Sequence, residues 1–212
     1  MDRFVRERCC TSLVQVEEAL RNGADRVELC EDLSCGGVTP SMDLLRLCCQ
    51  LPVKVHALIR PRGGDFVYSE DEVERMKESI RECREAGATG VVIGALTAEG
   101  DVDIPVMKAL IKEAKESGRE LSVTFHRAFD VCRDQFGALE EIVALGCERI
   151  LTSGGKDSAM EGRERLAQLV DSSGGRIIIL VAGAVDEEQL QSLAEDTGAV
   201  EFHGTRLCKS KR

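Results

Sequence analysis

The stretch ADRVELC, residues Ala24 to Cys30, has the length and the alternation of a short β-strand. Side chains alternate between the two faces of a strand, so Glu28 and Cys30 point to the same side, with Arg26 below them. On a solvent-exposed face this pattern would be ordinary. Inside a protein it would direct a carboxylate and a thiol toward something specific, because such groups are costly to bury. Whether this face is exposed to solvent or lies inside the protein depends on the sheet to which the strand belongs.

Apolar segments of strand length alternate with amphipathic segments of helix length along the whole chain. No linker rich in proline, glycine or serine separates them, so we expect one domain over residues 1–212. The eight expected strands are FVRERC from Phe4, DRVELC from Asp25, VKVHALIR from Val53, GVVIGAL from Gly90, LSVTFHR from Leu121, RILTSG from Arg149, IIILVAG from Ile177 and VEFHG from Val200.

A helix is predicted in each of the seven intervals between these strands. Ser69 and Glu72 have the spacing of a capping box, and Gly87 leads directly from a helix into the next strand. The alternation predicts an α/β fold, a closed TIM (β/α)8 barrel. A doubly wound open sheet is the alternative, but no glycine-rich fingerprint follows the first strand. The expected helix starts are Ser12, Ser41, Ser69, Asp103, Asp134, Ser158 and Asp186.

Composition and charge argue against several classes of protein. The net charge of −10, with one Tyr and no Trp, is unfavourable for binding nucleic acid. No apolar run is long enough to span a membrane, and the N-terminal sequence lacks the apolar centre of a signal peptide, so we expect a cytoplasmic protein. The ten cysteines are then expected to be reduced thiols, and the absence of a CxxC pair argues against a zinc ribbon or a thioredoxin-like motif.

In a closed barrel the eighth, first and second strands are neighbours, and each carries two polar residues two positions apart. The pairs are Glu7 with Cys9, Glu28 with Cys30, and Glu201 with His203. We expect the three pairs to lie side by side in the lumen, with the carboxylates one layer deeper and the softer donors toward the carboxyl-terminal rim.

Two further strand ends contribute charged residues to the same rim. IRPRGGDF supplies Arg60 and Arg62 beside a glycine turn, and TFHRAFD supplies His126, Arg127 and Asp130. Opposite charges would converge there, where a small anionic or polar ligand could be held. Core packing alone is a poor explanation for so many charges.

The motifs GADRVELC, IRPRGGDF, SVTFHRAFD, RILTSGGKDSAMEG and VEFH resemble, in order and spacing, those of the CutC family of copper homeostasis proteins. The resemblance covers almost the entire chain. It implies a TIM barrel in the cytoplasm, copper binding and a role in copper tolerance or trafficking, but no established reaction. Cys9 and Cys30 match the family's thiol positions, where Cu(I) would find the soft ligands that it prefers, and His203 could add a third donor.

Several of these residues also have simpler interpretations. Cys9 and Cys30 could be buried thiols that only fill space, as free cysteines commonly do. His56, deeper on its strand, is expected to be a hydrogen-bonded interior histidine. His126 could donate to a carboxylate across the lumen without touching a ligand.

Two functional classes follow. The first is a copper homeostasis protein whose thiolates hold Cu(I), acting as a buffer or carrier. The second is an enzyme of unknown reaction on a small polar or anionic substrate, with Glu28, His126 or Asp130 as the catalytic group, because the charges at the rim exceed what copper needs. The residues expected to bind such a ligand are Glu7, Glu28, Arg60, Arg62, His126, Arg127, Asp130 and Glu201.

Two departures from the family concern the end of the barrel. After the seventh strand, VAGAVDEEQ is one glycine short of the family's turn, which weakens the expectation of an anion site there. After His203 only GTRLCKSKR remains, so the eighth helix is expected to be missing. Val200 and Phe202 should then form an exposed apolar patch, with Arg6 and Arg8 presenting charge beside it. We expect self-association into a homo-oligomer, or reduced stability, as the consequence.

Overall fold

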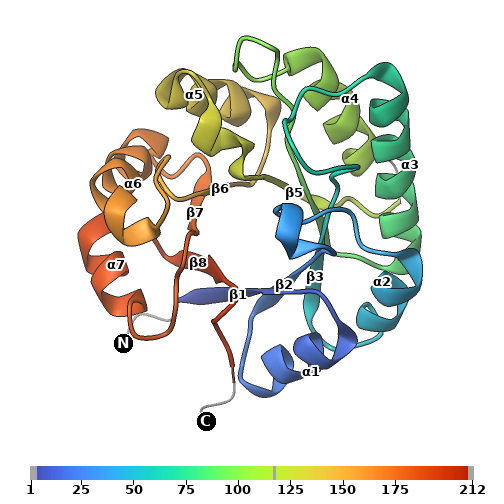
Figure 1. Cartoon of the computed structure of the whole chain (residues 1–212), viewed down its shortest axis with the longest axis horizontal. Coiled ribbons are helices and arrows are strands. Elements are labelled where there is room, and N and C mark those ends of the chain that lie inside the picture. The colour runs from blue at the N-terminus through green and yellow to red at the C-terminus, as the bar shows by residue number, and fades with distance from the viewer. Residues whose placement is uncertain (1–3, 117, 210–212) are drawn as a thin grey trace.

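The computed structural model describes residues 4–116 and 118–209 and contains a closed barrel of eight parallel strands, as the sequence predicted. The strands follow one another around the barrel in chain order, and β8 pairs with β1 (Figure 1). They are β1 (Val5–Cys10), β2 (Arg26–Leu29), β3 (Lys54–Leu58), β4 (Gly90–Ile93), β5 (Ser122–Phe125), β6 (Arg149–Thr152), β7 (Ile178–Val181) and β8 (Glu201–Gly204).

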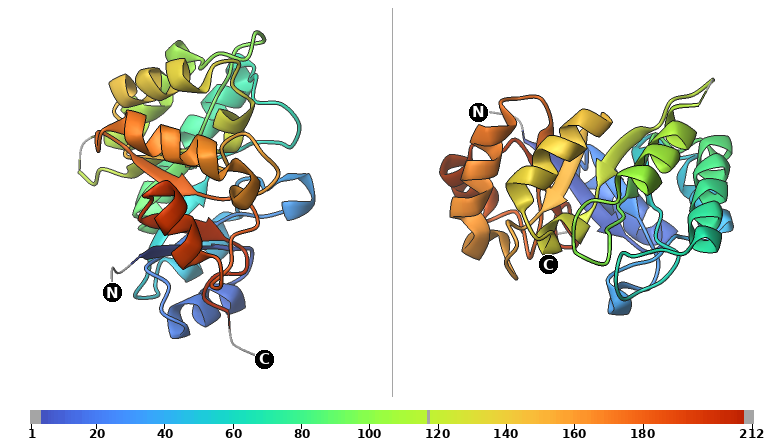
Figure 2. Two further views of the ribbon diagram at one scale, coloured as in Figure 1. Left: turned by 90° about the vertical axis from the view of Figure 1, so that its left-hand side faces the viewer. Right: turned by 90° about the horizontal axis from the view of Figure 1, so that it is seen from above.

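Seven α-helices in the described residues surround the strands (Figures 1 and 2). None of these helices is both long and apolar enough to cross a membrane. Two short 3-10 helices, η1 (Leu33–Cys35) and η2 (Arg127–Val131), follow β2 and β5 at the carboxyl-terminal end of the barrel. The α-helices are α1 (Leu13–Arg21), α2 (Met42–Cys48), α3 (Glu70–Ala86), α4 (Ile104–Lys115), α5 (Gln135–Leu145), α6 (Ala159–Ser173) and α7 (Leu190–Thr197).

Six of the seven expected helix starts are confirmed as N-caps, and Ser69 and Glu72 form the expected capping box. The start expected at Asp186 was wrong, because α7 begins only at Leu190. The backbone N–H of Gln189 donates to the carbonyl of Asp186, so a turn precedes the helix.

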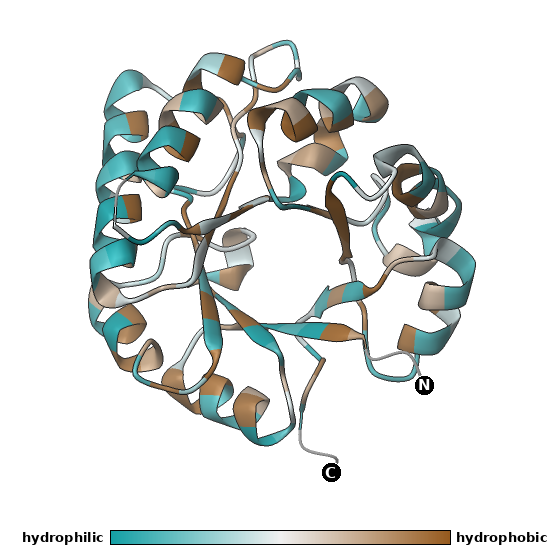
Figure 3. Ribbon diagram, turned by 180° about the vertical axis from the view of Figure 1, so that it is seen from behind, coloured by the Kyte–Doolittle hydropathy of each residue, from teal (hydrophilic) through white to brown (hydrophobic). Residues whose placement is uncertain are grey.

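The apolar core lies between the strands and the helices. On β2, Val27 and Leu29 are fully buried in this core, whereas Arg26 and Glu28 occupy the alternate positions and face the lumen. Figure 3 shows hydrophobic and hydrophilic stripes along the helices, as expected for helices with one face on a core. The face of ADRVELC that carries the polar residues is therefore the inside of the barrel.

The seam between β8 and β1 is covered, contrary to the prediction of an apolar patch containing Phe202. Val200 is 57% exposed, but Phe202 is fully buried and packs edge-on against Phe4, with the ring centroids 5.5 Å apart. Within the described residues no helix follows β8. Instead, residues 205–208 turn back, and Leu207 and Cys208 are buried in the same apolar cluster as Phe202.

Arg8 explains how a charged residue fits under this turn. Its guanidinium is buried, donates to the carbonyl of Cys208 at 3.0 Å and forms an ion pair with Glu18 at 2.7 Å. The outward arginine of β1 thus ties the returning segment to the barrel and to α1. We predicted a homo-oligomer because the seam was expected to be open, and with Phe202 buried that reason no longer holds.

Candidate functional site

The register of the barrel staggers the three polar pairs of the lumen. Glu7 on β1 lies opposite His203 on β8 and Arg26 on β2, while Cys9 lies opposite Glu28. The expectation of a carboxylate layer beneath a layer of softer donors was therefore wrong. Closing eight strands into a barrel requires tilted strands and a staggered register, which places a carboxylate of one strand beside a softer donor of the next.

A buried ion-pair network fills the lower part of the lumen. Arg26 bonds to Glu7 through Nε and to Glu201 through a terminal nitrogen at 2.7 Å, and Arg149 donates to the same Glu201 oxygen at 2.9 Å. Glu201 is thus held by two arginines and does not line the upper cavity. Sequence reasoning placed Arg26 on this face but missed it as the counter-ion of two carboxylates, and it missed Arg149, which starts β6.

Two thiols meet in the upper part of the lumen. The Sγ atoms of Cys9 and Cys30 are 3.6 Å apart, and a Glu28 oxygen lies within 4.8 Å of both. The hydrogen bond with Cys30, followed by burial and by the nearby Glu28, raises the pKa of the Cys9 thiol far above its usual range. Without a metal the Cys9 thiol is therefore protonated. A metal ion would have to displace its proton, as thiolate ligation requires.

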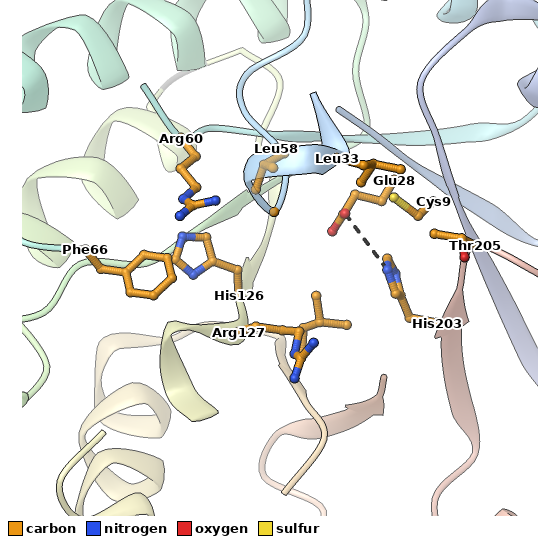
Figure 4. A pocket seen from close by; sticks show the side chains of 12 residues that line it. Cys9, Glu28, Leu33, Leu58, Arg60, Phe66, His126, Arg127, His203 and Thr205 are labelled. Atoms are coloured by element: carbon orange, nitrogen blue, oxygen red, sulfur yellow. Dashed lines mark ion pairs between the residues drawn. The ribbon is translucent and has the colours of Figure 1, made fainter. Parts of the chain in front are cut away.

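His203 belongs to a second cluster that overlaps the first. Its Nδ1 is 2.8 Å from a Glu7 oxygen, and its Nε2 is 4.0 Å from a Glu28 oxygen (dashed line in Figure 4). Ligand atoms of Glu7, Glu28 and His203 all lie within 4.8 Å of one another. The described residues thus place His203 with the two carboxylates, and Glu28 is shared between this cluster and the thiol pair.

Burial and charge act in opposite directions on these groups. Burial alone would raise the pKa of Glu7, but Arg26 and the hydrogen bond with His203 hold it well below the usual range. For Glu28, burial prevails and raises the pKa. For His203, burial would lower the pKa, but Glu28 and Glu7 outweigh it and raise it. Glu7 is therefore the fixed anion of the cluster, and Glu28 and His203 are the groups that can exchange a proton.

A cavity of about 250 Å³ opens above these clusters at the carboxyl-terminal end of the barrel (Figure 4). The thiol of Cys9 and the pair of Glu28 and His203 lie on one side of it. On the other side lie the cationic Arg60 and Arg127 and the ring of His126. The remaining lining residues are Leu33, Gly36, Leu58, Phe66, Leu151 and Thr205.

Two of the predicted rim residues do not line this cavity. Arg62 is bound to Glu72 at 2.7 Å and to Asp65 at 3.0 Å, so it fastens the loop after β3 to the start of α3. Asp130 accepts a 2.7 Å hydrogen bond from Arg127, and it also accepts the backbone N–H groups of Ser153 at 3.1 Å and Gly155 at 3.0 Å. Its carboxylate organises the loop after β6.

His56 is buried as expected, but the hydrogen bond predicted for it is absent at Nδ1. That atom has no partner among residues 4–116 and 118–209. Burial lowers the pKa of His56 to about 3, so the ring is neutral at physiological pH. The ring fits because it lies against Gly90 on β4, where an added Cβ would be only 2.6 Å from it.

Comparison with known proteins supports the resemblance found in the motifs. A sequence model of the CutC family matches residues 4–208. A CutC family protein of Parabacteroides distasonis is 47% identical over 205 residues, which cover 96% of this chain and 82% of the relative. The human copper homeostasis protein cutC homolog is 45% identical over 201 residues, covering 94% of this chain and 72% of the relative.

The fold comparison agrees. The crystal structure of a CutC protein from Streptococcus agalactiae superposes with a TM-score of 0.90 and 34% identity, covering 96% of this chain and 99% of that one. An aldolase with 16% identity and a TM-score of 0.71 shares the barrel fold alone. The motif order, the closed barrel and these relatives together show that this chain belongs to the CutC family.

Proposed function

We propose that this protein serves copper homeostasis by binding Cu(I) through Cys9 and Cys30, in the cytoplasm, as a buffer or carrier. The observation that carries the proposal is the 3.6 Å separation of the two Sγ atoms from neighbouring strands. Soft thiolates are the ligands that Cu(I) prefers. The names of relatives such as the human protein support a role in copper homeostasis.

The groups around the thiols fit a metal site. Cys9 lines the cavity, which gives an ion a route to a pair that is otherwise buried. Glu28 lies within 4.8 Å of both sulfur atoms and can take up a proton as a thiolate forms. When His203 is neutral and donates from Nδ1 to Glu7, its Nε2 lone pair is free to act as a further donor.

Anaerobic titration with Cu(I) against a competing chelator tests this site. Loss of an outer-shell partner typically weakens metal binding ten- to a hundredfold, so removing both ligands in a Cys9→Ser and Cys30→Ser double variant should weaken it by more than about a hundredfold. The control is Cys49→Ser with Cys132→Ser, which removes two half-buried thiols that do not line the cavity.

The control variant should bind Cu(I) as the unmodified chain does. Unchanged affinity in the Cys9 and Cys30 variant, with folding intact by circular dichroism, would contradict the proposal. An equal loss in both double variants would also contradict it, because binding would then follow the number of thiols and not their position.

A further inference from the structure

Arg60 is a buried cation whose hydrogen bonds go to neutral carbonyls. The side chain is buried, yet no carboxylate of residues 4–116 and 118–209 forms an ion pair with it. Its terminal nitrogens donate instead to three neutral carbonyls, those of Cys35, Gly37 and Gly64, at 2.8–3.0 Å. A buried charge is costly unless it is paired. The loops after β2 and β3 hold this guanidinium in place, and within the described residues no counter-ion reaches it.

His126 presents a second unsatisfied donor beside it. Its Nδ1 accepts the backbone N–H of Ala128 at 3.2 Å, which leaves the ring proton on Nε2. Nε2 is buried and has no partner in the part of the chain that the structure describes. Burial, assisted by Arg60, lowers the pKa of the ring to about 3, so His126 is a neutral donor.

Both groups are held in place by neighbouring residues. The guanidinium of Arg60 lies 4.9 Å from the centroid of Phe66, and the ring of His126 lies 5.0 Å from the same centroid. Figure 4 shows the guanidinium and the imidazole next to each other at one end of the cavity. Gly94, directly after β4, makes room for the imidazole, because a Cβ there would be 2.5 Å from it. Two positioned donors therefore lie side by side, and no acceptor among the described residues bonds to Nε2 of His126.

We propose that this end of the cavity binds the carboxylate of a small organic acid, with one oxygen on the guanidinium of Arg60 and one on Nε2–H of His126. The apolar walls of Leu33, Leu58 and Leu151 receive the carbon skeleton. A dry cavity of about 150 Å³ holds benzene. The cavity of about 250 Å³ thus limits the ligand to roughly ten non-hydrogen atoms. The site is separate from the thiol pair and does not depend on copper binding.

A carboxylate fits this end of the cavity better than a phosphate does. The site offers one cation and one neutral donor, which match the single charge and the two oxygens of a carboxylate. Phosphates in TIM barrels bind the loops after the seventh and eighth strands, at a helix N-terminus. Arg60 and His126 instead follow β3 and β5.

Titration of the copper-free full chain with butyrate and with benzoate tests the site, using calorimetry and the ¹⁵N NMR signals of the imidazoles. The chain has only three histidines, so the signal of His126 can be assigned by substitution. We expect saturable binding that shifts the Nε2 signal of His126, and much weaker binding of inorganic phosphate. Arg60→Lys and His126→Phe should each weaken binding at least tenfold, whereas His126→Gln should retain part of it through its amide N–H.

Arg62→Lys is the matched control, since this arginine follows Arg60 by two positions but lies outside the cavity. It should bind butyrate normally. Because the chain is titrated without copper, binding of the acid separates this site from the copper site. Absence of saturable binding of both acids overturns the proposal. Equal affinity in the unmodified chain, Arg60→Lys and His126→Phe also overturns it, as does phosphate binding as tight as that of the acids. If Arg60→Lys does not fold, His126→Phe decides, because it keeps the ring that packs on Phe66.

Discussion

His56 and His126 share an environment at the two ends of β4. Each ring is buried against a glycine, Gly90 at the start of β4 for His56 and Gly94 directly after β4 for His126. The absence of a Cβ leaves room for the ring, which comes from β3 for His56 and from the residue after β5 for His126, and burial then keeps that ring neutral. Two small residues thus determine where two functional groups of the lumen can lie.

These two rings make the fold sensitive to acid. The pKa of each is lowered to about 3 in the folded chain. Unfolded histidines titrate near 6.5. Below that pH the unfolded state binds more protons than the folded state, so the free energy of unfolding decreases as the pH is lowered. Between pH 6.5 and 5 each ring should contribute a loss of about 1 kcal/mol per pH unit on average. The raised pKa of His203 acts in the opposite sense, and only as pH rises above 6.5.

Urea denaturation of His56→Gln and of His126→Gln at several pH values measures this dependence. Each substitution should reduce the dependence of the free energy of unfolding on pH by the contribution of one histidine. Arg62→Gln, which removes no group that titrates in this range, should keep the full slope. If both histidine variants also keep it, the rings are not the source of the acid sensitivity.

At the scale of the elements, the helix starts show that a capping residue in the sequence does not ensure a capping bond. Ser69 accepts the N–H of Glu72 while the Glu72 carboxylate accepts the N–H of Ser69, so α3 has a complete capping box. Ser41 occupies the N-cap of α2 but makes no side-chain cap hydrogen bond. Its own N–H donates to Glu31 at 2.9 Å instead.

We therefore expect Ser69→Ala to lower the free energy of unfolding by about 1 kcal/mol, because α3 loses the side-chain acceptor of its first turn. Ser41→Ala should change it by less than about 0.5 kcal/mol. Urea denaturation of the two variants in parallel compares the starts directly. Equal effects would mean that the hydroxyl hydrogen bond is not what stabilises α3.

At the scale of the whole molecule, closure of the barrel depends on how residues 205–208 cover the β8–β1 seam. Phe202 and Leu207 are fully buried there, and Arg8 links the returning segment to α1. Val200, two positions before Phe202 and just ahead of β8, is 57% exposed. The two apolar residues, which the sequence pattern predicted to be equally exposed, thus differ in burial.

Phe202→Ala should lower the free energy of unfolding by about 3–5 kcal/mol, as expected for a large cavity in a packed core. Val200→Ala should change it by less than about 0.5 kcal/mol, because the side chain is largely in water. Thermal and urea unfolding measure both. A similar small effect for the two variants would show that the seam is open in solution.

The sequence by itself determined the local features of this protein. The two-residue period of strands such as ADRVELC placed Arg26, Glu28 and Cys30 on one face, and the alternation of strands with capped helices determined the barrel. These features depend on neighbours a few residues apart, so they can be inferred before any long-range contact is known. The site residues at the ends of β1, β2, β3, β5 and β8 were found for the same reason.

Only the tertiary structure decided which of these residues meet. The stagger of the closed barrel set His203 beside Glu7 and Cys9 beside Glu28. Contacts between distant segments bury Phe202. Arg62 and Asp130 form ion pairs and hydrogen bonds within loops and do not line the cavity. Likewise, the loops after β2 and β3 place the carbonyls of Gly37 and Gly64 against the Arg60 guanidinium, and neither is a counter-ion. Such arrangements depend on the register and on loop packing between residues far apart in the chain, and no local pattern encodes them.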